Sequence, residues 1–114
     1  MLDNTELIKL SAREAVRLLK AGDVTPMEMV DAAAERIKFV DRYVNALPTL
    51  CIDEAREQSN KLEVPKQTGP GWLAGLPIVV KDLNEIKGVL TTYGSQIFSD
   101  NIPHKDEISV SQLR

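Results

Sequence analysis

The amino-terminal half of the chain carries apolar residues at helical spacing, interrupted by residues typical of helix ends. Ser11 and Thr25 each stand three residues before a glutamate, which is the spacing of a capping box. Pro26 occupies a first-turn position where proline is tolerated, and Gly22 can end the preceding helix. These signals predict helices over residues of about 11–21 and 26–40, with a third, largely charged helix over 53–62.

Two shorter apolar runs have the composition of β-strands. The first covers about 46–52, and Pro48 near its start favours an edge position because proline cannot donate a ladder hydrogen bond. The second covers about 77–81 and contains three consecutive β-branched residues after Pro77. No repeat or low-complexity tract separates these elements, so the pattern predicts helices followed by strands.

Lys81 ends the second predicted strand and precedes Asp82. Burial beside a core strand disfavours the ammonium form, and a partly neutral lysine can act as a base or a nucleophile. The same position also fits a surface lysine that extends its amine from a strand end into water. Position alone leaves both interpretations open.

The residues around this lysine, from Leu73 to Ser95, read LAGLPIVVKDLNEIKGVLTTYGS. This segment closely resembles the lysine-bearing stretch of the amidase signature family, whose members hydrolyse or transfer amides through a Ser-cisSer-Lys triad. The resemblance implies that Lys81 is the triad lysine and that the chemistry passes through an acyl-enzyme without metal or organic cofactor. It also implies an α/β fold with a mixed central sheet, in which residues 1–114 form the amino-terminal part of a single amidase domain.

A protein-kinase interpretation was weighed for the same run, because residues 78–81 resemble the V-A-I-K strand of kinases. Three upstream glycines, Gly69, Gly71 and Gly75, are spaced one residue too far apart for the kinase loop. Pro77 intrudes where a hairpin has to pair its strands, and no room remains for a second strand. The kinase interpretation is therefore set aside.

Polar neighbours of Lys81 have two possible roles. Thr91, Thr92 and Ser95 are candidates to hydrogen-bond the lysine amine and hold it in place. Asp82 is expected to serve a turn or a cap, because neighbours on a strand point to opposite faces.

The chain lacks the Gly-Gly-Ser-Ser-Gly-Gly type of loop that supplies both serines in the family. None of its own serines has glycines on both sides to provide amides for an oxyanion hole. Residues 106–114 begin like a helix and finish without a stop signal. These features lead to two hypotheses: a truncated part of an amidase, not expected to be active alone, or a catalytically inactive remnant that acts as an interaction module.

Composition narrows the function classes further. The 114 residues are 43% hydrophobic and 27% charged, with a net charge of −3, which is typical of a soluble globular protein. Scattered basic residues and 4% aromatic content argue against nucleic-acid binding. Cys51 is the single cysteine and His104 the single histidine, so neither an internal disulfide nor a metal site is expected.

Expected location and partners follow from the same features. The first residues lack a signal-peptide pattern and no apolar stretch reaches about 18 residues, so a cytoplasmic chain without membrane association is expected. The expected partner is a small-molecule amide substrate in the complete enzyme. Self-association is possible for this chain alone, since strands cut from a sheet leave their edges exposed.

Overall fold

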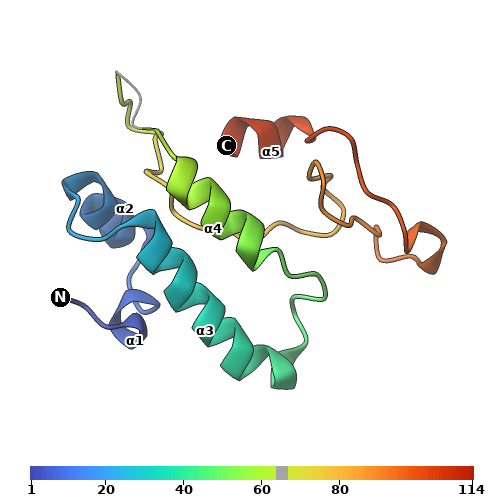
Figure 1. Cartoon of the computed structure of the whole chain (residues 1–114), viewed down its shortest axis with the longest axis horizontal. Helices are drawn as coiled ribbons and strands as arrows, with labels where there is room; N and C mark the ends of the chain where they lie inside the picture. The colour runs from blue at the N-terminus through green and yellow to red at the C-terminus, as the bar shows by residue number, and fades with distance from the viewer. Residues whose placement is uncertain (64–66) are drawn as a thin grey trace. The chain divides into compact units, whose positions relative to one another are not determined.

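The computed structural model describes residues 1–63 and 67–114, which form two compact units (Figure 1). The first unit, Met1–Pro77, contains α1 (Asn4–Leu7), α2 (Ala12–Ala21), α3 (Pro26–Val44) and α4 (Ile52–Lys61). The second unit, Ile78–Arg114, contains the short 3-10 helix η1 (Gln96–Phe98) and α5 (Ile108–Leu113).

The predicted α/β fold is wrong, because no strand occurs among the residues that the structure describes. Ala46–Cys51 is an irregular link, in which the amides of Ala46 and Leu47 donate to the Asp41 carboxylate at 2.7 and 3.3 Å. This side-chain cap at the end of α3 uses the amides that strand pairing would need, and Ile52 already belongs to α4.

The strand predicted at 77–81 is also absent, for a different reason. Its residues 77–80 form no hydrogen bond with any described residue. A strand exists only where a neighbouring segment pairs with it, and composition alone cannot supply that neighbour. Ile78 and Val79 are consequently exposed to 49% and 72%, rather than buried in a sheet.

The capping boxes predicted at Ser11 and Thr25 are present in the structure. Ser11 caps α2 and Thr25 caps α3, each in a reciprocal capping box with the glutamate three residues later. Gly22 adopts φ +76° and ends α2 in the left-handed conformation. Asn45 does the same for α3 with φ +50°, so this helix runs beyond the predicted residue 40 to Val44. A further capping box at Asp3 begins α1, which sequence patterns did not reveal.

Replacing Thr25 by alanine removes the Oγ1 acceptor of the Glu28 amide, at 3.2 Å, and one side of the capping box. We expect the free energy of unfolding to fall by about 1 kcal/mol, as is usual for loss of an N-cap. Thr49→Ala is the matched control, since the Thr49 side chain has no hydrogen bond with a described residue. Urea titration of both variants measures the difference, and equal losses would contradict the capping role.

The core of the first unit lies between α1, α2 and the start of α3, and the returning segment 72–76 packs on it. Its buried members are Leu7, Ala15, Leu19, Val24, Met29, Ala32 and Ala74. Trp72 and Leu76 are half-buried against this cluster.

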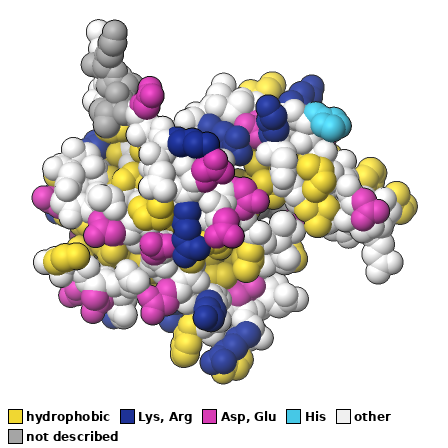
Figure 2. All heavy atoms as spheres, viewed as in Figure 1, with side chains coloured by type: hydrophobic (Ala, Val, Ile, Leu, Met, Phe, Trp, Pro, Cys, Tyr) yellow, Lys and Arg dark blue, Asp and Glu magenta, His cyan; other side chains and the backbone are white. Residues whose placement is uncertain are grey.

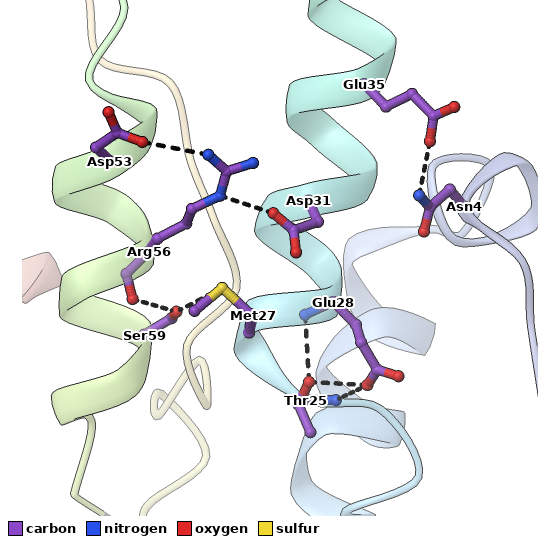
Figure 3. Close-up of polar contacts among 9 residues, drawn as sticks. All are labelled: Asn4, Thr25, Met27, Glu28, Asp31, Glu35, Asp53, Arg56 and Ser59. Carbon is purple, nitrogen blue, oxygen red and sulfur yellow. Dashed lines mark hydrogen bonds and ion pairs between the residues drawn. The ribbon is translucent and has the colours of Figure 1, made fainter.

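Helix α3 lies between α1 and α4 and binds each through polar side chains (Figure 3). Asp31 accepts a hydrogen bond from Arg56 Nε of α4 at 2.8 Å, and Arg56 also contacts Asp53 within its own helix at 3.2 Å. On the other side, Asn4 Nδ2 of α1 donates to Glu35 at 2.6 Å. Both contacts involve exposed or half-exposed groups, so they contribute little to the free energy of folding. Their main effect is to fix which helices lie beside α3.

Candidate functional site

Lys81 lies in the second unit, at the first position of a turn rather than at the end of a strand. Its carbonyl accepts from the Asn84 amide at 2.9 Å, which closes the turn. The residue is exposed, and its amine forms no hydrogen bond or ion pair with any residue that the structure describes. Of the two interpretations that position left open, the structure shows the exposed lysine, because no strand precedes it among the described residues.

Asp82 is anchored ten residues further along the chain, at Thr92. Its Oδ1 accepts from the Thr92 amide at 2.8 Å, and its Oδ2 accepts from the Thr92 hydroxyl. The Gly94 amide donates in turn to that hydroxyl oxygen at 3.2 Å. The expected turn role of Asp82 is confirmed, and these bonds fix the backbone that follows Lys81.

The same bonds lower the pKa of Asp82 below its ordinary value, chiefly through the Thr92 hydroxyl and then through the Thr92 amide. A lowered folded-state pKa means that the unfolded chain takes up the proton more readily. The stabilisation is therefore complete above the ordinary aspartate pKa of about 4 and is lost as the pH falls through the folded-state value.

We expect Asp82→Asn to remove this part of the acid sensitivity. The difference in unfolding free energy between the natural chain and the variant should shrink as the pH is lowered from about 5 to about 2. Urea midpoints measured across that range test it. Asp100→Asn removes a carboxylate that accepts no hydrogen bond from a described residue, and is the matched control. An identical change in both variants would remove Asp82 from this role.

The remainder of the unit is held by antiparallel backbone contacts between residues 85–91 and 101–107. The amides of Gly88, Thr91 and Glu107 donate to carbonyls of the facing segment at 3.0 Å each. Asn101 Nδ2 adds a bond to the Thr91 carbonyl at 2.8 Å, and Thr91 is only 2% exposed. These contacts give a closed loop whose two ends lie next to each other.

Thr91, Thr92 and Ser95, the candidates to hydrogen-bond the Lys81 amine, form hydrogen bonds with other groups. Thr92 binds Asp82, and the Thr91 hydroxyl donates to the Val89 carbonyl at 3.2 Å. The Ser95 hydroxyl accepts from the Ile97 amide at 3.3 Å and caps η1. None of the three contacts the Lys81 amine in this structure. Their role is to shape the loop around Asp82.

Tyr93 has partners within the second unit that the sequence did not predict. Its hydroxyl donates to Glu85, its ring meets Phe98 edge-on with centroids 5.0 Å apart, and its backbone has φ +54°. The bond to the Glu85 carboxylate raises the pKa of Tyr93 above its ordinary value, with burial acting in the same direction. The sequence shows only a tyrosine before Gly94, and it reveals neither the left-handed backbone of Tyr93 nor Glu85 as its partner.

The arrangement thus presents one primary amine on a turn whose following residue is fixed by several hydrogen bonds. An amine in this setting can accept or return a proton for a group brought next to it. Within residues 1–63 and 67–114, no cluster of histidine, cysteine, aspartate and glutamate is arranged to hold a metal ion.

Comparison with known proteins identifies the family. The model of the amidase family matches residues 28–114, which include α3 from Glu28 onward, all of α4 and the second unit. The chain belongs to the amidase family.

The similar curated proteins are glutamyl-tRNA(Gln) amidotransferase subunits A. That of Renibacterium salmoninarum is 37% identical over 112 residues, and that of Salinispora tropica is 36% identical over 114 residues. In both cases the match covers 96% of this chain but only 22% and 23% of the relative. The chain therefore spans less than a quarter of these relatives, and no solved structure gives a significant match.

The helices are also short or polar compared with membrane-spanning segments. Among the helices of the described residues, none combines the length and the apolar character that crossing a bilayer requires.

Proposed function

We propose that this chain supplies the lysine-bearing part of an enzyme that cleaves carboxamide C–N bonds. The observation that carries the proposal is the family match over residues 28–114, which includes the segment from Leu73 to Ser95 around Lys81. The structure supports it with an accessible amine on a turn fixed through Asp82 and Thr92.

In the proposed mechanism, neutral Lys81 Nζ takes a proton from a bridging serine, which takes one from the nucleophilic serine. The serine oxygen attacks the carbonyl carbon, the C–N bond breaks, and the relayed proton leaves with the amine. Water or another nucleophile then releases the acyl group. Residues 1–114 contain no pair of serines in a glycine-rich loop, so they are not expected to turn over substrate alone. The proposed chemistry needs no cofactor.

The proposed substrate class is a small primary amide that serves as nitrogen donor. It rests on the relatives, which are named as amidotransferase subunits acting for glutamyl-tRNA(Gln). These relatives are named as subunits, which supports the proposal that the assembled enzyme binds partner proteins. A cytoplasmic location is also part of the proposal. It is supported by the presence of a single cysteine in the chain and by the relatives, which are bacterial amidotransferase subunits.

The test is a graft. Residues 1–114 replace the matched stretch of the Renibacterium salmoninarum subunit, and the product is assayed for ammonia release from glutamine. Activity above the level of a graft bearing a nucleophilic-serine substitution is expected. A folded but inactive graft would contradict the proposal and favour the inactive remnant.

A further inference from the structure

Helix α3 is buried in its first half only. Its buried side chains are Met29, Val30 and Ala32, all within the first two turns. In the second half, Phe39 is exposed to 60%, Tyr43 to 76% and Val44 to 60%. Large apolar side chains on a well-capped helix without a covering element mark a surface that another molecule can cover.

A groove of about 540 Å³ lies between α1 and this uncovered half of α3. Its apolar surface comes from Phe39 of α3, which is 60% exposed, and from the half-buried Ile8, just after α1. Its basic side chains are Arg36, Lys38 and Arg42, all from α3. From residue 32 to residue 42 the helix rises about 15 Å, so the groove is long enough for about ten residues of a second helix.

The charge in this groove is opposite to that of the whole chain. Three basic side chains line it in a protein of net charge −3, and none of the three forms an ion pair with a described residue. The one acidic side chain in the lining, Glu35, already accepts a hydrogen bond from Asn4.

The guanidinium of Arg42 is held in place by aromatic rings. It lies over the Phe39 ring at 5.3 Å and over the Tyr43 ring at 4.6 Å, both measured to the ring centroid. Figure 2 shows basic and hydrophobic side chains next to each other near the end of α3. Cation–π contacts of this kind fix the charge without neutralising it, so the guanidinium keeps its donors for an acidic partner.

We propose that this groove is a docking site for an acidic amphipathic helix of a partner protein. The apolar face of that helix packs on Ile8 and Phe39, and its flanking carboxylates face Arg36, Lys38 and Arg42. Two helices already form the walls, so a third helix along α3 completes the layer. The site lies wholly in the first unit and does not depend on the role of Lys81.

The experiment uses the full 114-residue chain and two synthetic helical peptides. Both carry leucine at positions i, i+3, i+4 and i+7; one has glutamate and the other lysine at the flanking positions. Fluorescence anisotropy at low salt measures their binding. The acidic peptide should bind at least about tenfold more tightly than the basic one, and this preference should weaken as salt is added.

Variants locate the site. Arg36→Glu combined with Arg42→Glu should weaken binding of the acidic peptide by about tenfold or more and should improve binding of the basic peptide. Arg13→Glu with Arg17→Glu makes the same change in charge on exposed positions of α2, outside the groove, and should have little effect. If circular dichroism shows that the first double variant has lost helix, Lys38→Glu in the same groove carries the same expectation. Lys81→Ala should bind like the natural chain.

Several outcomes would overturn the proposal. Equal binding of both peptides, or equal loss in both double variants, would remove the groove as the site. Tighter binding of oligo(dT) at the same residues would indicate a polyanion surface instead. A dimer that Phe39→Ser dissociates would show that a second copy of the chain occupies the groove.

Discussion

Lys81→Ala, introduced into the graft with the Renibacterium salmoninarum subunit, is expected to lower kcat/KM for amide hydrolysis by about 100-fold to 10,000-fold. This is the range that a positioned general base contributes. The alanine variant should keep its fold, because the Lys81 amine forms no hydrogen bond or ion pair with any described residue. The loss should fall on kcat more than on KM, since the proposed role lies in proton transfer and not in substrate binding.

Two further variants make the test specific. Lys81→Arg places a permanent positive charge at this position and cannot lose its proton at working pH, so it should be as inactive as alanine. Lys87→Ala removes another exposed lysine of the same unit and should leave turnover unchanged. Activity in the arginine variant would show that charge alone suffices, and would remove the proton relay from the mechanism.

Gly75→Ala is expected to have the largest effect on stability, lowering the free energy of unfolding of the first unit by about 2–5 kcal/mol. Gly75 has φ +84°, a conformation that costs an L-residue about 1–2 kcal/mol. An added Cβ would also lie 2.7 Å from Leu62 Cδ2 and 2.7 Å from Pro26 Cγ. The proline ring is rigid and begins α3, so this overpacking adds about 1–3 kcal/mol.

Two other glycines separate the causes. Gly88→Ala shares a positive φ, +78°, but its Cβ would meet no atom within 4 Å, so only the backbone cost should appear. Gly71→Ala has open space and no such φ, so its effect should be small. Chemical denaturation followed by circular dichroism compares the three. Equal losses at Gly75 and Gly88 would show that the contact with Pro26 contributes nothing.

Sequence reasoning succeeded where the signal is local. The capping boxes at Ser11 and Thr25 and the stop at Gly22 each involve residues within one helical turn, and the structure confirms all three. The turn role of Asp82 was recoverable for the same reason, because aspartate beside a turn commonly accepts backbone bonds. Thr92, whose amide donates this bond, lies ten residues away. The sequence had instead suggested Thr92 as a hydrogen-bond partner of the Lys81 amine.

The two predicted strands failed because strands are not local structures. An apolar, β-branched run has the composition of a strand, but it becomes one only when another segment supplies hydrogen-bond partners. Around residue 46 the Asp41 carboxylate takes the free amides, and at 77–80 no described segment pairs with the chain. The groove on α3 was also invisible in the sequence, since Ile8 and Phe39 are 31 positions apart in it.

The sequence by itself therefore determined the starts of α2 and α3, the end of α2, the family and the candidate lysine, because capping chemistry and the motif around Lys81 are carried by neighbouring residues. Only the tertiary structure decided that Lys81 lies on an exposed turn, that Gly75 packs against Pro26, and that three basic side chains share one groove with Phe39. Each of these depends on how segments distant in sequence approach one another, and side-chain packing and backbone pairing between segments set that approach.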